Sequence, residues 1–510
     1  MVSEIFDYEN PYYSLYYLRY FLVTVIHLKL IVLWYHVTYS VGGFLMDVDL
    51  MERLLKRTLS GGGEYADIFF ERRNSTAIQF EDGRIEKAVS GSVAGIGIRL
   101  VCEGKTAYAY SNDFSEKTLG EISDTVRNAM SRSSSGVPKD VNINLNRRYP
   151  DVRFDIKIPP AAVSMPRKIA IVREADEAAR KFSDSVKQVN IVYRDTIQKI
   201  KIYSSDGFFA EDDRVYTTAV AQVISIKNGS IQTGVETEGG LIGFELFEKR
   251  PFSDIAYKAA ERAVRMLGAR RAPGGRMPVV ISSEAGGTMI HEAIGHGLEA
   301  DLAHRGLSVY SGKLGQQVAA QVITVIDDAT LPNKRGSFSF DDEGTPSKRN
   351  VLVRQGMLEG YMYDKYTAAL DGTVSTGNGR RESYENKPIP RMTNTFIAPG
   401  RDRPDEVIRS VEHGLLIKKM GGGQVNTVTG DFVFDVQEGY LIEHGQVSDL
   451  VRGATLVGSG PEVLKSIDMV GSDLGFSIGT CGKDAQGVPV SDAMPTLRIR
   501  EIVVGGVVST

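Results

Sequence analysis

The motif His291–His296, with the sequence HEAIGH, constrains this chain more than any other segment. Two imidazoles and a neighbouring carboxylate are the parts of a hydrolytic zinc centre, in which the imidazoles bind the metal and the carboxylate acts as a base. The histidines are five positions apart, whereas the usual zinc-peptidase helix separates them by four. At about 100° per residue, a regular α-helix would place the rings roughly 140° apart. The backbone must therefore change between them, through a π-turn or a helix end near Gly295.

The composition and the flanking residues favour a metal role over two unrelated helix histidines and a solvated glutamate. The chain has only 7 His, so a close pair is not expected from composition. The preceding run 278–290 indicates a buried strand, a glycine turn and the start of a helix near Thr288. Ligands carried by such an apolar element would point inward, where a metal could hold them.

A catalytic zinc has three protein ligands and an open water position, so a third ligand must come from elsewhere. The candidates are Glu299, Asp301, His304, His413, His444 and Cys481. Cys481 lies in a glycine-rich stretch beside Lys483, and positive charge favours the thiolate that binds metals. Residue chemistry alone leaves the choice open between Cys481 and the nearby acids.

The overall composition is that of a globular protein of 510 residues, long enough for two or more domains. The net charge of −4 and the pI of about 6.1 give no sign of nucleic-acid binding. The two cysteines, Cys102 and Cys481, are far apart in sequence and form no disulfide framework. We therefore expect a cytoplasmic protein.

Residues 1–45 differ from the rest of the chain, because they hold 8 of the 22 Tyr and the only Trp. The run 20–35 is apolar enough to raise a membrane anchor as an alternative. His27 and Lys29 interrupt it, so we expect membrane attachment to be unlikely and translation to begin at Met46.

The remaining sequence predicts an α+β fold. An antiparallel meander is expected over 65–112, helices over 115–132, 167–184 and 253–269, and strands over 188–194, 197–204 and 214–226. The stretch 268–275, rich in Gly and Arg, marks a boundary between an α+β domain (46–270) and a mainly antiparallel β domain (276–510). The second domain should carry the HExxxH helix and a shorter helix near 404–413.

Several segments resemble the TldD family of zinc metalloproteases. In chain order they are HEAIGHGLEAD, SFSFDDEGTPSKRNVLVRQGMLEGYM, TGNGRRESYENKPIPRMTNT, GGGQVNTVTGDFVF and CGKDAQGVPVSDAMPTLRI. The similarity covers about residue 46 to the C-terminus. It implies zinc on His291, His296 and Cys481, with Glu292 as the catalytic base.

The resemblance also implies partners and a substrate class. Family members act as dimers, some with a TldE/PmbA-like subunit that lacks HExxxH, and cut unstructured or modified peptides inside an enclosed cavity. This chain keeps the motif and so resembles the active subunit, as a homodimer or as part of a heterodimer.

Three further groups of residues are candidates for supporting roles. Asp342 and Glu343 could hold the second nitrogen of a histidine, or form an ordinary solvated turn. The pair Arg380 and Arg381 could bind a substrate carboxylate or carbonyl, or lie at a surface or interface. The glycine run that includes Gly422 and Gly423 could pair with an extended peptide, or form a tight turn.

The sequence therefore favours a cytoplasmic zinc endopeptidase. The alternative is a non-catalytic, zinc-stabilised subunit that binds peptides for a partner. Intact Glu292 favours the enzyme, because a structural zinc needs no base and usually has four protein ligands. A third possibility, a protease anchored in a membrane, is suggested only by residues 1–45.

Overall fold

The computed structural model describes residues 47–131 and 142–507. The chain divides into two compact units, Met1–Met51 and Glu52–Thr510. Residues 1–45, and with them the predicted start site and the apolar run 20–35, lie outside the described residues. Within the described ranges, no helix is both long and apolar enough to cross a membrane. The first described helix is α2 (Val48–Leu59).

The predicted meander is confirmed as three antiparallel strands, β1 (Tyr65–Glu81), β2 (Arg84–Cys102) and β3 (Lys105–Ser111). Asp82 and Glu103 have positive φ angles of 48° and 47°, and each precedes a glycine that also has a positive φ. This backbone is typical of tight hairpin turns, for which Asp-Gly and related pairs are sequence signals.

The same sheet continues through three long strands, β5 (Val186–Ser204), β6 (Phe208–Lys227) and β7 (Ser230–Leu241). The strand order is β3-β2-β1-β5-β6-β4, with β7 pairing β6 and the short β4 (Asn146–Arg147) parallel to β6. The two strands expected over 188–194 and 197–204 form the single strand β5. The register with β1 and β6 continues without a break through the residues between them.

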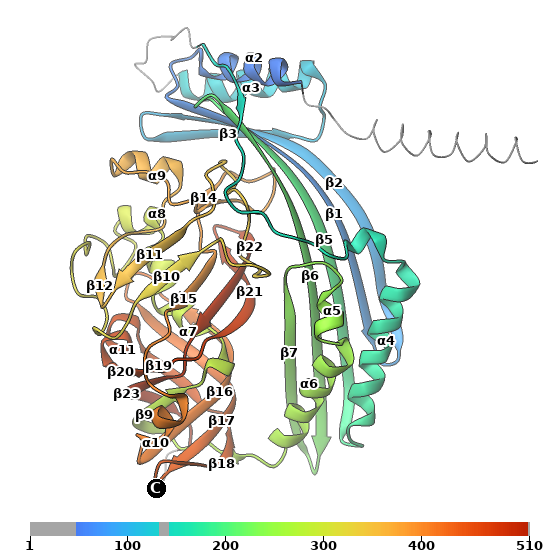
Figure 1. Cartoon of the computed structure of the whole chain (residues 1–510), viewed down its shortest axis with the longest axis vertical. Coiled ribbons are helices and arrows are strands. Elements are labelled where there is room, and N and C mark those ends of the chain that lie inside the picture. The colour runs from blue at the N-terminus through green and yellow to red at the C-terminus, as the bar shows by residue number, and fades with distance from the viewer. Residues whose placement is uncertain (1–46, 132–141, 508–510) are drawn as a thin grey trace, which may run out of the picture. The chain divides into compact units, whose positions relative to one another are not determined.

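Helices cover part of this sheet. The expected helices are α3 (Glu116–Ser131), α4 (Met165–Lys181) and α6 (Phe252–Met266), with a 3-10 turn at Pro160–Ala162 and a short α5 (Leu246–Lys249). Helices α4 and α6 pack on each other and along the long strands (Figure 1). Small residues of α6, such as Ala259 and Ala263, let the helix approach the sheet closely, and a Cβ at Gly234 of β7 would meet the Ala259 carbonyl oxygen at 2.0 Å.

The C-terminal half contains a closed ring of five strands, because β16 pairs both β9 and β17. The ring runs β16 (His413–Val425), β9 (Gly275–Ile281), β23 (Leu497–Gly505), β19 (Thr455–Ser459) and β17 (Asp431–Glu443). Strands β18 (Gln446–Arg452), β8 (Arg270–Arg271) and β20 (Ile467–Val470) extend it. Buried apolar side chains fill its interior.

A second sheet of this half has the order β12-β11-β10-β15-β22-β21. Its strands are β12 (Met357–Leu358), β11 (Arg349–Arg354), β10 (Val325–Asp328), β15 (Asn394–Ile397), β22 (Gln486–Met494) and β21 (Gly475–Lys483). A two-stranded pair, β13 (Gly379–Arg380) and β14 (Ile389–Pro390), and helices α9 (Lys365–Leu370), α10 (Pro404–Arg409) and α11 (Gly460–Ser466) complete the half. Most pairings are antiparallel, which confirms the expected α+β class, although β16–β9, β15–β22 and β18–β8 are parallel.

The HExxxH segment does not form one regular helix, which confirms the break predicted from the five-residue spacing of its histidines. Instead α7 (Thr288–Ile290) leads into a π-helical turn (His291–Gly295), a 3-10 turn (His296–Leu298) and α8 (Ala300–His304). The chain thus changes its helical type three times within seventeen residues, and the reason lies in the contacts of the site.

Candidate metal centre and active site

The motif backbone follows the π-turn that its spacing requires. The His296 N–H donates to the carbonyl oxygen of His291, five residues earlier, in place of the four-residue bond of an α-helix. This wider turn brings residues five apart to the same side of the chain. The two imidazole rings lie 4.9 Å apart, centroid to centroid, at an angle of 86°.

Neighbouring residues hold this turn in place. A Cβ at Gly295 would meet the sulfur of Met392 at 2.2 Å, so any larger residue there would displace this buried side chain. The hydroxyl of Tyr310 donates to the Ala293 carbonyl oxygen at 2.8 Å, which satisfies a buried acceptor inside the turn. The apolar side chains of Met289 and Ile294 are fully buried in the main core of the C-terminal half, which fixes the orientation of the whole turn.

Cys481 reaches the two histidines from β21. Its sulfur lies 3.6 Å from Nε2 of His296, and the ligand atoms of the three residues all lie within 4.8 Å of one another. All three side chains are buried. The buried guanidinium of Arg391 donates to the Cys481 carbonyl oxygen and so ties the backbone of β21 beside the motif.

Each histidine has a carboxylate on its other ring nitrogen. Asp492 of β22 lies 2.8 Å from Nδ1 of His291, and Glu299 lies 3.0 Å from Nδ1 of His296. Such partners orient an imidazole and increase its basicity, and here they leave the Nε2 atoms for the centre. The close approach of β22 depends on Gly287, where a Cβ would meet the backbone of Asp492 at 2.3 Å.

The charge around the thiol favours its ionised form. Burial opposes the thiolate, but hydrogen bonds and the charge of the two histidines outweigh it and lower the pKa of Cys481 to about 5. Burial likewise opposes ionisation of Glu299, but Lys483 and His296 outweigh it and hold the pKa of this carboxyl at about 2. The thiol and this carboxyl are therefore both ionised at neutral pH.

Two imidazoles and one thiolate fit zinc. Zinc binds nitrogen and sulfur ligands, and a site with three protein ligands keeps a position for water. Thiolate ligands disfavour hard cations such as Mg²⁺ and Ca²⁺, which prefer oxygen ligands. The donor set, its burial and its carboxylate partners together fit a zinc ion.

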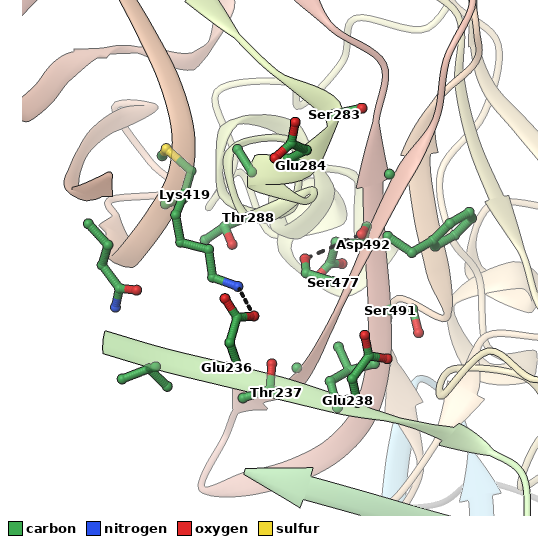
Figure 2. Close-up of a pocket in the computed structure, with 18 of the residues that line it drawn as sticks. Glu236, Thr237, Glu238, Ser283, Glu284, Thr288, Lys419, Ser477, Ser491 and Asp492 are labelled. Carbon is green, nitrogen blue, oxygen red and sulfur yellow. Dashed lines mark hydrogen bonds and ion pairs between the residues drawn. The ribbon is translucent and has the colours of Figure 1, made fainter. Parts of the chain in front are cut away.

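Glu292 and His291 line a large cavity beside this centre. The cavity has a volume of about 1210 Å³. One wall comes from β7 and α6, and the other from β16, β21, β22 and the turn before the motif (Figure 2). Glu292 is half-buried, and burial raises the pKa of its carboxyl. A glutamate next to a metal ligand, with access to a cavity of this size, is placed to exchange protons with a bound molecule.

Charged side chains from both walls meet across the cavity. Lys419 of β16 lies 3.2 Å from Glu236 of β7 (Figure 2). Glu236 also pairs with Arg262 of α6, and Arg262 with Glu438 of β17 at 2.7 Å. Burial and neighbouring positive charge lower the pKa of Lys419 to about 8. These ion pairs join the two halves of the chain at the rim of the cavity.

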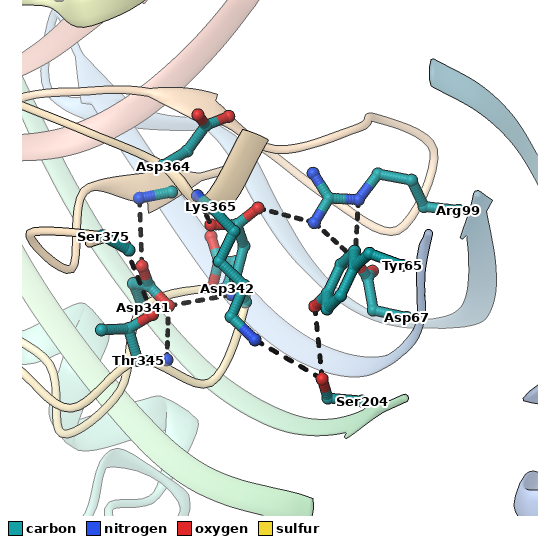
Figure 3. Close-up of polar contacts among 12 residues, drawn as sticks. Tyr65, Asp67, Arg99, Ser204, Asp341, Asp342, Thr345, Asp364, Lys365 and Ser375 are labelled. Carbon is teal, nitrogen blue, oxygen red and sulfur yellow. Dashed lines mark hydrogen bonds and ion pairs between the residues drawn. The ribbon is translucent and has the colours of Figure 1, made fainter. Parts of the chain in front are cut away.

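Asp342 and Glu343, the candidates for supporting the histidines, contact arginines instead. Asp342 accepts from Arg214 at 2.8 Å, and Glu343 accepts from Arg99 at 2.6 Å. Arg99 also donates to Asp67, so the acidic turn joins the N-terminal sheet to the C-terminal half (Figure 3). The carboxylates at the imidazoles are Asp492 and Glu299. The role of Glu299 could have been suspected from the sequence, because it lies three positions after His296, whereas nothing in the sequence connects Asp492 with His291.

Arg380 and Arg381 are buried and are not among the described residues that line the cavity. Arg380 donates to the Pro489 carbonyl oxygen at 2.7 Å, and Arg381 donates to the Asp342 carbonyl oxygen at 2.9 Å. The Arg381 guanidinium also lies over the ring of Phe69. Both arginines hold segments of the chain together.

Gly422 and Gly423 lie in β16, beyond the part of the strand that pairs with β9. A Cβ at Gly423 would meet the Phe434 ring at 2.1 Å, whereas nothing lies within 4 Å of one at Gly422. The described cavity lining includes Lys418, Lys419 and Met420 of the same strand, just before the glycines.

The remaining candidate ligands lie elsewhere. Asp301 pairs with Lys483 at 2.9 Å, and His304 pairs with Asp371 at 3.0 Å. His413 and His444 form an exposed group with Glu412. Glu299, also a candidate, contacts His296 through Nδ1, whereas Cys481 is the described candidate whose ligand atom groups with those of both motif histidines.

Comparisons with known proteins agree with this arrangement. Models of three successive domains match the chain: PmbA/TldA metallopeptidase domain 1 over residues 66–133, the central domain over 158–267 and the C-terminal domain over 274–506. The chain belongs to the PmbA/TldD metallopeptidase family.

Curated relatives named as metalloproteases match this chain over most of their length. The chain is 38% identical over 450 residues to a Metalloprotease TldD homolog of Haemophilus influenzae, which covers 87% of this chain and 93% of the relative. A Zinc metalloprotease TldD homolog of Saccharolobus solfataricus is 27% identical, with 90% and 100% covered. The chain is thus a metalloprotease of the PmbA/TldD family.

Solved structures share the fold of this family member. A Thermotoga maritima protein described as a putative modulator of a DNA gyrase superposes with a TM-score of 0.74 at 21% identity, covering 90% of this chain and 99% of that one. TldE from Thermococcus kodakarensis gives a TM-score of 0.70 at 17% identity, with 90% and 100% covered.

Proposed function

We propose that this chain is a zinc-dependent endopeptidase that hydrolyses unstructured or modified peptides inside its large cavity. The observation that carries the proposal is the convergence of His291, His296 and Cys481 beside Glu292 at the cavity wall. A structural zinc would need no neighbouring base and no access to a cavity.

In this proposal His291, His296 and Cys481 hold the metal. Zinc bound there supplies Lewis-acid polarisation of a water and of the peptide carbonyl. The two imidazoles present Nε2 because Asp492 and Glu299 occupy their Nδ1 atoms. Burial of all three ligands keeps bulk water from competing with them.

Glu292 is the proposed general base. Its carboxylate accepts a proton from the attacking water and returns it to the leaving amine. Burial raises the pKa of this carboxyl, which makes the carboxylate a stronger base than an exposed glutamate. Base catalysis of this kind contributes about 10²–10⁴-fold to the rate.

We propose that the substrate binds as an extended chain. The part of β16 from Lys418 to Gly423 pairs with β17 on one side, and no described strand pairs with its other side. A peptide could add there through main-chain hydrogen bonds, which depend little on side-chain identity. Gly422 and Gly423 would keep that edge accessible. A cavity of about 1210 Å³ accommodates an extended segment but excludes a folded domain.

One experiment separates the peptidase from the alternative, a non-catalytic subunit that binds peptides for a partner. The purified chain is incubated with an unstructured reporter peptide, then treated with a chelator and resupplied with zinc. The peptidase hydrolyses the peptide, loses activity with the metal and regains it with zinc. A zinc-loaded chain that binds the peptide but leaves it intact supports the alternative.

We also propose that the chain works as a dimer, either with itself or with a TldE/PmbA-like subunit. The likeness of its fold to TldE of Thermococcus kodakarensis supports the second arrangement. The mass of the native complex, with metal analysis, tests it: two metal sites per dimer indicate the homodimer and one indicates the heterodimer.

A further inference from the structure

We propose that Lys334, together with the ring of Phe476, forms a subsite for a substrate carboxylate in the cavity. The inference rests on the proposed peptidase function and adds a substrate preference to it. The carboxylate belongs either to the C-terminus of a peptide or to an acidic side chain.

The first observation is the charge pairing of the cavity. Its half-buried lysines Lys418 and Lys419 have acidic partners, Glu284 and Glu236, each at 3.2 Å. Lys334 is also half-buried, but no ion pair of the described residues includes it. Its ammonium lies instead over the Phe476 ring, 3.7 Å from the centroid. An ammonium held on an aromatic face keeps its charge and its N–H groups available for an anion.

The remaining unpaired charges of the cavity differ from Lys334 in exposure or position. Lys249 and Lys258, which have no ion pair among the described residues, are solvent-exposed. Of the unpaired acids in the described lining, Asp254 and Glu261 lie on α6, and Glu292 is the proposed base beside the motif histidines. Lys334 is therefore the half-buried lysine of the described cavity lining that has no acidic partner. Burial and the nearby Arg250 lower the pKa of its ammonium, as expected for a cation without a counter-ion.

The second observation is the fixed position of the loop that carries Lys334. The Arg335 side chain donates to the Gly479 carbonyl oxygen at 2.6 Å, and its backbone N–H donates to Ser491 at 2.9 Å. On the other side, a Cβ at Gly240 of β7 would meet the Asn333 carbonyl oxygen at 2.1 Å. The loop is thus anchored between β7 and β21, and the ammonium has a defined place at the cavity wall.

The third observation is the separation of Phe476 from Cys481 along β21. Phe476 and Cys481 lie on the same strand, β21, whose residues from Gly475 to Thr480 line the cavity. Five residues of a strand span about 16 Å at about 3.3 Å each. Side chains alternate along a strand, so Phe476 and Cys481 point to opposite faces of β21, which is an edge strand of its sheet. An extended substrate running along this edge would place a group about five residues from the cleaved bond next to Lys334.

Peptide binding to the zinc-loaded Glu292→Gln protein tests the subsite without requiring turnover. Fluorescent unstructured peptides are compared in matched pairs: a free C-terminus against its amide, and amidated peptides with an internal Asp against Asn. We expect about 10-fold tighter binding of the carboxylate peptides, because a hydrogen bond to a charged group contributes at least that much. The C-terminal pair and the internal pair show which source of carboxylate is preferred.

Variants of two cavity lysines decide the outcome. In the Glu292→Gln background, Lys334→Gln should abolish the preference and Lys334→Arg should keep it. Lys249→Gln removes the same charge from an exposed position of the same cavity lining, outside the β16 segment, and should leave the preference unchanged. Equal affinity for all peptides, or a preference that survives Lys334→Gln, overturns the subsite. Neither result affects the proposed hydrolysis, which wild-type cleavage of the amidated peptides measures separately.

Discussion

The sulfur of Cys481 lies 3.6 Å from Nε2 of His296, although 185 positions separate the two residues in the sequence. This contact joins the second sheet of the C-terminal half to the helical turn that carries the motif. It depends on β21 being held beside that turn, which Arg391 does through the Cys481 carbonyl oxygen. The metal centre is therefore a product of tertiary structure and not of the motif alone.

Replacement of Glu292 by Gln should separate metal binding from catalysis. The amide keeps the shape of the side chain but cannot accept the proton of water, so activity should fall by about 10²–10⁴-fold. Zinc content should stay at the wild-type value, because Glu292 is not one of the grouped ligands. Peptide hydrolysis and metal analysis on the same preparation test this. Full activity in the variant would refute the base role.

Replacement of Cys481 by Ser should remove zinc. The serine hydroxyl does not ionise at neutral pH as this thiol does. Zinc affinity should therefore fall by more than the factor of about 10–100 that is expected when a ligand loses its hydrogen-bond partner. Competition with a chromogenic chelator measures it. Cys102→Ser is the matched control, because Cys102 lies in β2, outside the ligand group, and should leave zinc affinity unchanged.

Replacement of Asp492 by Asn should weaken zinc binding by about 10–100-fold, because His291 would lose the charged partner of its Nδ1. The same chelator competition measures the loss. Asp371→Asn provides the control, since Asp371 makes a similar contact with His304, which is exposed and is not part of the centre. Equal affinities of the two variants would contradict the supporting role of Asp492.

The pH profile of kcat/KM should report the titration of Glu292. Burial raises the pKa of this carboxyl above its ordinary value of 4.5, so it takes up a proton at a higher pH than an exposed glutamate. The base is active only when ionised, so activity should fall as the pH drops through this raised pKa. Metal analysis at each pH shows that zinc is still bound. The residual activity of Glu292→Gln should lack this acidic limb.

Replacement of Arg99 by Met should destabilise the fold. Arg99 bonds Asp67 and Glu343, and all three side chains are almost fully buried. The variant leaves two buried carboxylates without their main counter-charge, which costs about 3–5 kcal/mol. Urea unfolding monitored by circular dichroism measures the change. The exposed pair Arg53–Glu116 supplies the control, because Arg53→Met should cost less than about 1 kcal/mol.

The sequence already contained most of the local structure. The hairpin turns after Glu81 and Cys102 were visible because an Asp-Gly or Glu-Gly pair interrupts alternating apolar residues. Helices α3, α4 and α6 followed from their apolar periodicity and end within about three residues of their expected bounds. Long strands were harder to predict: the middle of β5 is polar, and only its pairing with β1 and β6 makes it continuous.

The motif spacing determined that a regular helix could not serve both histidines, because residues five apart point in different directions on an α-helix. The tertiary structure determined the form of the turn. Gly295 packs against Met392, and the Tyr310 hydroxyl donates a hydrogen bond to the Ala293 carbonyl oxygen within the π-turn. It also decided that Asp492, rather than the acidic turn at Asp342, supports His291. Periodicity and turn chemistry act between neighbours in sequence, whereas the partners of a buried polar group are set by the strands that pack around it.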